Sequence, residues 1–168
     1  MRFKRGRVWK CVAVAALGLL LGGCDGTLTA DLATDPPSDT SIRSVQVNVR
    51  GLDLRMSDGA SKTLEFNSGE LVDLLDLQNG NPMRLFTNED LPVGSYTGVR
   101  LLFDKDEDGN AVTNGNGDAP LVLAAGAYAA VDFSVEDQKS STERLSLMLD
   151  LRQSLSFDKA KDEYTLKP

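Results

Sequence analysis

The sequence predicts an all-β fold, an antiparallel β-sandwich of about 7–10 short strands, preceded by a leader segment at residues 1–23. Three observations predict it. Apolar and polar residues alternate with a period of two over most of the chain after residue 41. Asp-Gly and Asn-Gly dipeptides recur between the alternating segments. Residues 24–168 provide 145 residues, enough for a single domain with its own core.

The alternating segments each present one apolar and one polar face. In the first, valines and polar residues alternate over residues 45–50, Gly51 interrupts, and leucines resume the pattern over residues 52–55. A glycine inside such a run is typical of a β-bulge. Three further segments alternate in the same way, at residues 99–103, 131–135 and 145–152. This pattern indicates half-buried strands of antiparallel sheets.

Turn signals separate these segments. The dipeptides typical of hairpin turns are Asp58-Gly59, Asn79-Gly80 and Asp108-Gly109. Residues 33–41 contain two prolines among Asp, Ser and Thr, which predicts a loop. Pro92 and Gly94 predict a turn before a strand at Tyr96. Residues 70–77 fit either a strand or one short helix, and we favour the strand.

Residues 1–23 have the pattern of a cleavable leader. A basic stretch precedes an apolar run of 11 residues from Cys11 to Leu21, which is too short for a membrane span of about 20 residues and typical of a signal peptide. The run ends in Leu21-Gly22-Gly23-Cys24, which resembles the lipobox of bacterial lipoproteins. The resemblance implies cleavage before Cys24, a diacylglycerol on its thiol and an acyl group on its new amine. The alternative is an ordinary secretory signal that contains a cysteine.

Charge is distributed unevenly along the chain. Residues 1–23 carry five basic and no acidic side chains, so the net charge of −7 for the whole chain leaves −12 for residues 24–168. Such an acidic domain would repel nucleic acid and anionic lipid headgroups, so we expect contact with a membrane only through the lipid on Cys24. The expected location is the bacterial cell envelope. Asp25 resembles the enterobacterial signal for retention in the inner membrane, but other bacteria use other positions, and the choice of membrane stays open.

The composition excludes several kinds of site. The chain has no histidine, and its two cysteines are Cys11, inside the leader, and Cys24. Ser-His-Asp and Cys-His catalysis, imidazole-dependent zinc sites and an internal disulfide in the mature chain are therefore excluded. A glycoside hydrolase needs only two suitably spaced carboxylates, but Asp73 and Asp76 would lie on opposite faces of a strand. Trp9 lies in the leader, so few aromatic residues remain for stacking on a glycan.

Residues 104–110 form the one dense acidic cluster. Its candidate calcium ligands are Asp104, Asp106, Asp108 and Asn110, because oxygens at alternate positions followed by Gly109 can converge on a hard cation. An EF-hand would need a glutamate at the twelfth position of the loop, where Gly115 stands, so an EF-hand is excluded. The competing interpretation is a solvated hairpin tip whose charges protect a sheet edge.

Several segments together resemble a known family. They are Leu28 through Pro36, Leu71 through Gly80, the block Leu91-Pro92-Val93-Gly94-Ser95-Tyr96, Leu149 through Ser154, and Tyr164 through Pro168. In this order, from about Gly26 to Pro168, they resemble the family of bacterial envelope lipoproteins called domain of unknown function 4382. The Leu-Pro-x-Gly-x-Tyr block also resembles transthyretin-like and carboxypeptidase-regulatory-like sandwiches. The resemblance implies an extracytoplasmic β-sandwich with no assigned activity.

Taken together, these observations predict a signal peptide at residues 1–23 and a single β-sandwich domain at residues 24–168. We interpret it as a lipid-anchored, non-catalytic structural or interaction module whose protein or glycan partner the sequence leaves open. The first alternative is a calcium- or glycan-binding module, in which Ca²⁺ would be the only cofactor. The second is a carboxylate-dependent glycoside hydrolase.

Overall fold

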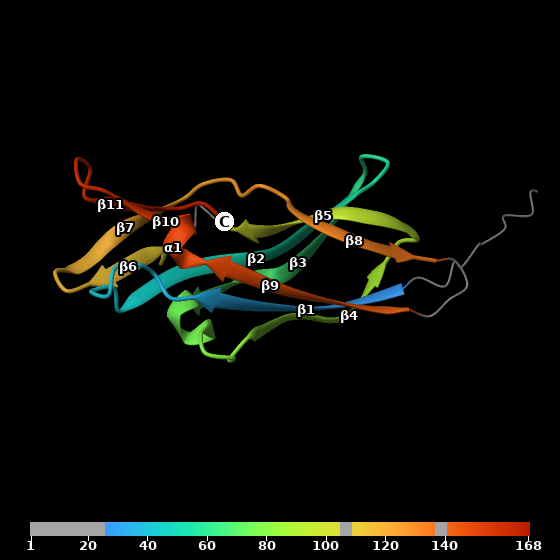
Figure 1. The fold of residues 1–168 in the computed structure, drawn as a ribbon, viewed down its shortest axis with the longest axis horizontal. Coiled ribbons are helices and arrows are strands. Elements are labelled where there is room, and N and C mark those ends of the chain that lie inside the picture. The colour runs from blue at the N-terminus through green and yellow to red at the C-terminus, as the bar shows by residue number, and fades with distance from the viewer. Residues whose placement is uncertain (1–25, 105–108, 137–140) are drawn as a thin grey trace, which may run out of the picture.

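A computed structural model describes residues 26–104, 109–136 and 141–168 of the chain. Within these ranges, β-strands predominate and are arranged in two sheets (Figure 1). The strands are β1 (Gly26–Asp35), β2 (Ser44–Met56), β3 (Ser61–Asp73), β4 (Met83–Leu91), β5 (Gly94–Phe103), β6 (Ala111–Asn114), β7 (Gly117–Leu123), β8 (Ala129–Val135), β9 (Thr142–Asp150), β10 (Leu155–Asp158) and β11 (Glu163–Leu166). The predicted all-β class is confirmed, with one strand more than the upper end of the predicted range.

The smaller sheet has the order β4-β1-β9, and the larger runs β10-β11-β7-β6-β2-β5-β8, with β3 paired to β2. Most neighbours are antiparallel, as predicted. Two pairs are parallel: β1 with β9, and β11 with β7. The expectation of purely antiparallel sheets is therefore wrong for these pairs. Alternation reports which face of a strand is buried, and it carries no information about the direction of a partner far away in the sequence.

Strand β2 lies at the centre of the larger sheet and carries much of the core. Val45, Val47 and Val49 are fully buried on one side of Gly51, and Leu52 and Leu54 on the other. The buried positions change from odd to even numbers across Gly51, where the register with β3 and β5 shifts. An extra residue at this point keeps both apolar runs on the core face. The predicted bulge is confirmed.

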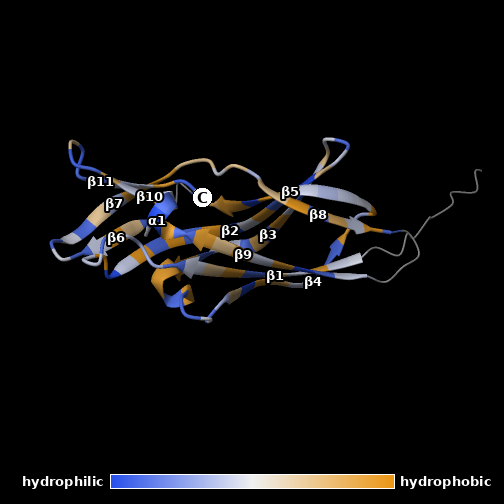
Figure 2. Cartoon of the chain, viewed as in Figure 1, coloured by the Kyte–Doolittle hydropathy of each residue, from blue (hydrophilic) through white to orange (hydrophobic). Residues whose placement is uncertain are grey.

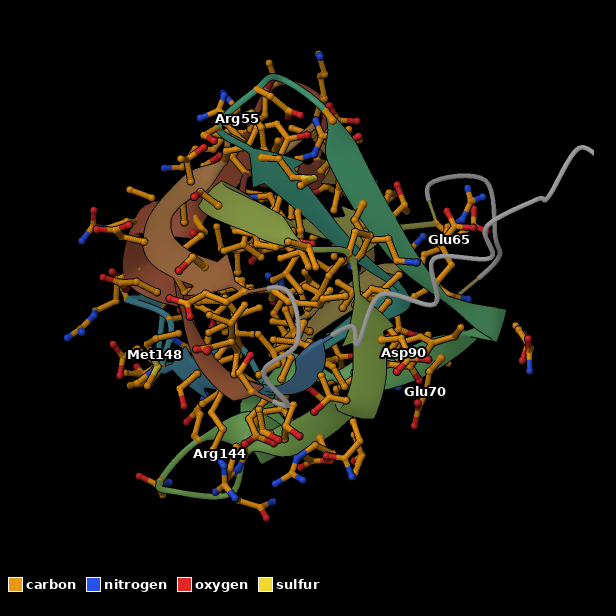
Figure 3. All side chains as sticks on the ribbon, turned by 90° about the vertical axis from the view of Figure 1, so that its right-hand side faces the viewer. Arg55, Glu65, Glu70, Asp90, Arg144 and Met148 are labelled. Carbon is orange, nitrogen blue, oxygen red and sulfur yellow. The ribbon has the colours of Figure 1, made fainter. Side chains whose placement is uncertain are left out.

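The hydrophobic core lies between the two sheets. Figure 2 shows apolar residues alternating with polar ones along the strands. Figure 3, seen from the end where β1 begins, shows Arg55, Glu65, Arg144 and Met148 at the periphery and densely packed side chains inside. The interior includes Tyr96, whose buried ring stacks on Phe133 with centroids 4.8 Å apart.

Tyr96 occupies the place that the sequence predicts for it. Its hydroxyl donates a hydrogen bond of 2.8 Å to the carbonyl oxygen of Pro92, four residues earlier. The buried hydroxyl therefore has a partner inside the same turn, which ties the start of β5 to the chain before it. The block around Pro92 and Gly94 thus stabilises the turn that precedes β5.

The turn predictions have mixed outcomes. Asp58-Gly59 joins β2 and β3 as a hairpin, as predicted. Asn79-Gly80 makes a turn, but β4 after it pairs with β1, so the hairpin predicted there is wrong. The strand favoured for residues 70–77 continues only to Asp73, and a 3-10 helix, η1 (Leu74–Leu77), follows. The Asp73 carboxylate caps η1 by accepting from the backbone N–H of Leu75 at 3.0 Å.

Two further boundaries differ from the prediction. The loop predicted at residues 33–41 begins only after Asp35, because pairing with β9 extends β1 to that residue. The alternation predicted to continue to residue 152 ends at Asp150, where the short helix α1 (Leu151–Ser154) begins. The first difference arises from a contact with a distant segment, and the second from the Asp150 side chain, which caps α1 locally.

Candidate functional site

Cys24, the predicted lipidation site, lies outside the described residues. Gly26, two positions later, is already the first residue of β1: it is buried and paired with Leu91 of β4. The next backbone N–H, of Thr27, donates to the carbonyl oxygen of Ser141 at 2.8 Å. The folded domain is therefore fixed from Gly26 onward, directly after the position where the lipid would be attached.

The acidic cluster lies between two strands that do not pair with each other. β5 and β6 both pair with the same strand, β2, through different parts of its length. A hairpin tip joins two neighbouring antiparallel strands, so the interpretation of residues 104–110 as a hairpin tip, with Asp108-Gly109 as its turn, is wrong. The segment instead connects two strands that follow one another along β2. Asp106 and Asp108 lie outside the described residues.

Asn110 connects the two described ends of this cluster through hydrogen bonds of its side chain. Its side-chain nitrogen donates to the carbonyl oxygen of Asp104 at 2.9 Å, and its side-chain oxygen accepts from the backbone N–H of Asn48 at 2.8 Å. The backbone N–H of Asp104 in turn donates to the carbonyl oxygen of Asn48. Asn110 therefore connects the end of β5 with the start of β6. Its side-chain oxygen, a candidate calcium ligand, already accepts a hydrogen bond from the backbone of β2.

Calcium binding by the cluster stays a prediction. Among the residues the structure describes, no group of three or more acidic or sulfur side chains is arranged to hold a metal. The check is the melting temperature of the protein in chelator, in calcium and in magnesium. A calcium-specific rise that disappears in Asp104→Asn/Asp106→Asn is expected for a site. An equal rise with magnesium would contradict it, because screening also stabilises an acidic domain.

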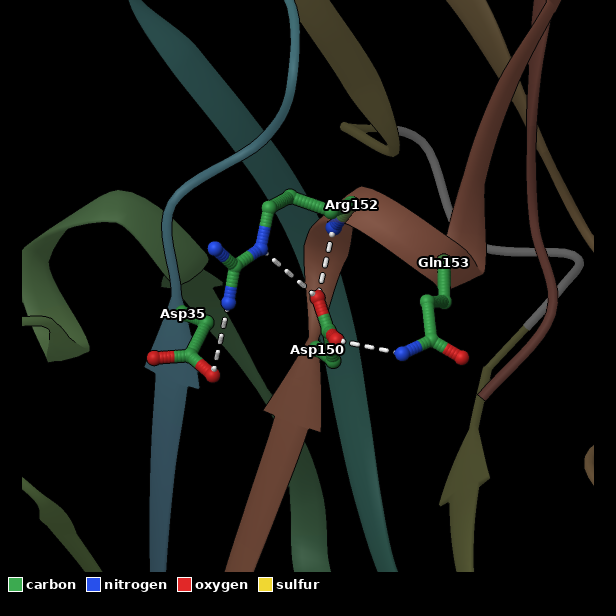
Figure 4. A network of polar contacts seen from close by, with 4 residues as sticks. All are labelled: Asp35, Asp150, Arg152 and Gln153. Carbon is green, nitrogen blue, oxygen red and sulfur yellow. Dashed lines mark hydrogen bonds and ion pairs between the residues drawn. The ribbon is translucent and has the colours of Figure 1, made fainter.

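A polar network joins the ends of β1 and β9 (Figure 4). Asp150 accepts hydrogen bonds from the backbone N–H of Arg152 at 3.0 Å and from the Gln153 amide at 2.8 Å, and the Arg152 guanidinium reaches Asp35 at 3.5 Å. Desolvation raises the pKa of Asp150, but the combined hydrogen bonds from Arg152 and Gln153 hold it below its usual value. The network caps α1 and fixes the direction in which the chain leaves the smaller sheet.

Beside this network lies a groove of about 540 Å³. Its lining includes Ala33 and Asp35 of β1, Leu77 of η1, Pro82, and the exposed Met148 of β9. The groove thus brings together the opening strand, the segment around residues 71–80 and the last long strand, β9. These segments are far apart in the sequence; the parallel pairing joins β1 to β9, and the Thr34 hydroxyl of β1 donates a hydrogen bond to the carbonyl oxygen of Leu74 in η1.

A second polar cluster lies on the outer face of the larger sheet. Asp53 of β2 has only 8% of its side chain exposed, and its carboxylate oxygen Oδ2 accepts from Arg100 Nη2 of β5 at 2.6 Å. The Tyr128 hydroxyl donates to the same oxygen. The guanidinium groups of Arg55 and Arg100 lie 4.7 and 4.6 Å from the Tyr128 ring centroid. A Cβ on Gly98 would approach that ring at 3.2 Å, so glycine makes room for it.

This cluster attaches the segment between β7 and β8 to the sheet. The hydrogen bond to Asp53 raises the pKa of the Tyr128 hydroxyl, because ionisation would place a second negative charge beside the carboxylate. The raised pKa means that this contact stabilises the fold below the ordinary tyrosine value of about 10 and is lost as the pH rises above it. No sequence pattern points to this cluster beyond the polar positions of alternating strands.

A pocket of about 310 Å³ lies where the β6–β7 and β10–β11 hairpins meet the segment after β1. Its lining comes from all three: Asp39, Ser41, Asn114, Asn116, Gly117, Asp118, Ala119, Phe157, Lys159, Asp162 and Tyr164. Hydrogen bonds from the backbone and side chain of Ser41 lower the pKa of Asp39. These hairpins lie at the end of the molecule opposite the start of β1 (Figure 1). Sequence reasoning missed the pocket because its parts meet only in the folded chain.

Of the two carboxylates considered for hydrolysis, Asp73 has a structural role. Its oxygen accepts from the backbone N–H groups of Val45 and Leu75, each at 3.0 Å. Asp76 lies exposed on η1. The two therefore stand on different kinds of element, and the prediction that both lie on one strand is wrong.

Comparison with known proteins identifies the family to which this chain belongs. In the part of the chain that the structure describes, no helix is long and apolar enough to cross a membrane. A search of curated proteins finds no match. The family model described as domain of unknown function (DUF4382) matches residues 25–168 of the 168 residues of the chain. The chain therefore belongs to the DUF4382 family.

Proposed function

We propose that this protein is a lipid-anchored lipoprotein of the bacterial cell envelope, and that its β domain is a non-catalytic structural or interaction module. One observation carries the anchoring: the lipobox-like cysteine stands directly before the folded domain. The family match begins at residue 25 and β1 at Gly26. Cleavage before Cys24 would therefore remove the apolar leader and leave the whole domain intact.

The same observation orients the domain. Only Asp25 separates Cys24 from Gly26, a span of at most about 7 Å of extended chain between their Cα atoms. The end of the sandwich where β1 begins would lie against the bilayer, and the hairpins β6–β7 and β10–β11 would point away from it (Figure 1). An anchored module in this orientation presents its far end to the envelope space.

A binding or structural role also fits the carboxylates. Asp53, Asp73 and Asp150 each accept hydrogen bonds that hold the fold together. A glycosidase needs a proton donor and a second carboxylate on either side of the bond that it cleaves. These three carboxylates are instead committed to an ion pair and two helix caps.

Membrane fractionation of Cys24→Ala tests the anchor. The wild-type protein is expected in the membrane fraction and resistant to washing with high salt, because two or three acyl chains contribute about 0.8 kcal/mol for each buried CH₂. Cys24→Ala is expected to lose acylation and cleavage by the lipoprotein peptidase, and to keep its leader. Cys11→Ala is the matched control and should behave as wild type. Equal labelling of wild type and Cys24→Ala by a palmitate analogue would contradict the proposal.

A further inference from the structure

The pocket between the β6–β7 and β10–β11 hairpins has an exposed aromatic wall. Phe157 on β10 is 42% exposed, and its ring lies 4.7 Å from that of Tyr164 on the paired strand β11. Tyr164 packs against the Phe157 ring in a tilted arrangement, and part of the Phe157 side chain stays exposed. The open face of an aromatic ring is electronegative and attracts the polarised C–H groups of a sugar ring.

Beside this wall, Tyr164 presents a hydrogen-bond donor. Asn114 Oδ1 accepts from the backbone N–H of Asn116 at 2.8 Å, which orients the amide so that Nδ2 donates to the Tyr164 hydroxyl at 3.1 Å. The hydroxyl oxygen is thus already an acceptor, and its own proton has no acceptor among the described residues. Tyr164 is only 4% exposed, so this proton is a buried donor in the wall of a pocket.

Carboxylates in the pocket lining supply hydrogen-bond acceptors for a ligand. Asp118 accepts from the Thr113 hydroxyl at 2.6 Å through one oxygen, and its second oxygen has no partner in the described part of the chain. Asp39 and Asp162 also line the pocket, and Lys159 is the one basic side chain in its lining. A ligand hydroxyl can accept from Tyr164 and donate to a carboxylate, whereas an anionic ligand would be repelled.

We propose that this pocket binds a neutral sugar residue of a glycan, with Phe157 as the stacking surface and Tyr164 and Asp118 as hydrogen-bonding groups. Its volume of about 310 Å³ lies at the lower end of ligand pockets and suits a single sugar ring. The inference rests on the proposed non-catalytic interaction role, for which it names the ligand class. The pocket lies at the end that the anchored domain would turn away from the membrane.

The test uses the full-length chain, expressed in a bacterium and purified in detergent from whichever fraction contains it. Saturation-transfer NMR measures binding of the methyl glycosides of glucose, galactose, mannose and N-acetylglucosamine, with methyl glucuronide as the anionic counterpart. At least one neutral glycoside is expected to bind. Phe157→Leu keeps an apolar side chain and Tyr164→Phe keeps the ring, and each is expected to weaken binding about tenfold.

Met148→Ala, which removes an exposed apolar side chain that does not line the pocket, is the matched control and should bind like wild type. Cys24→Ala should also bind like wild type, so failure of the anchor and failure of the sugar site are observed separately. Absence of binding by every neutral glycoside would overturn the inference. So would stronger binding of the glucuronide, or unchanged affinity in both Phe157→Leu and Tyr164→Phe when circular dichroism shows them folded.

Discussion

Gly51→Ala is expected to destabilise the protein by about 3–5 kcal/mol, through backbone strain and overpacking together. A Cβ at this position would lie 2.0 Å from the carbonyl oxygen of Leu64 and 2.9 Å from the Cα of Glu65. Both atoms belong to the backbone of β3, which cannot move away without breaking its pairing with β2. The φ angle of +156° adds strain for any residue with a side chain. Urea denaturation measures the loss.

Gly59→Ala is the matched control. Gly59 also has a positive φ, of +89°, but a Cβ there would meet nothing within 4 Å. Gly59→Ala is therefore expected to lower the free energy of unfolding only through the left-handed conformation, by about 1–2 kcal/mol. A loss for Gly51→Ala no larger than that for Gly59→Ala would show that β3 does not pack against the bulge as described.

Asp53→Ala is expected to cost about 3 kcal/mol. Breaking a buried ion pair typically costs about 3–5 kcal/mol because the remaining charge has no partner. The lower end applies here because Arg100 keeps 31% of its side chain exposed, so water can solvate it in part. The change also removes the acceptor of the Tyr128 hydroxyl, and the segment between β7 and β8 should lose protection from hydrogen exchange.

The exposed ion pair on the same strand provides the control. Arg50 and Glu65 lie 3.2 Å apart, with 52% and 42% of their side chains exposed. Glu65→Ala is expected to cost less than about 1 kcal/mol, as solvent-exposed pairs do. If the two substitutions shifted the denaturation midpoint by the same amount, the Asp53–Arg100 pair would have no special role in the fold.

The sequence predicts the strands better than their partners. The alternation around Gly51 and the block at Tyr96 are continuous patterns in the sequence, and both predictions are confirmed. Pairing of β1 with β9 joins segments more than a hundred residues apart. No local pattern encodes that pairing, and it extends β1 to Asp35. Residues 70–77 were hard to predict because Asp73 ends a strand and caps a helix at once.

The candidate sites also differ in how far a continuous sequence pattern predicts them. A lipobox is a continuous pattern, so Cys24 can be predicted from four adjacent residues. The acidic segment is also continuous, but the role of Asn110 depends on Asn48 in β2. The proposed sugar pocket joins Asn114, Phe157 and Tyr164, whose positions meet because β11 pairs with β7. An exposed phenylalanine has no signature in a sequence until the fold shows which side of its strand faces solvent.

Mass spectrometry of the N-terminal peptide tests the central claim most directly. The protein is purified from the membranes of a bacterium that expresses the full chain, digested, and its most apolar peptide is sequenced. The account predicts a peptide that begins at Cys24 and carries a diacylglycerol on the thiol, with or without an acyl group on the amine. A peptide that begins at any other residue, or an unmodified Cys24 at the N-terminus, would contradict it.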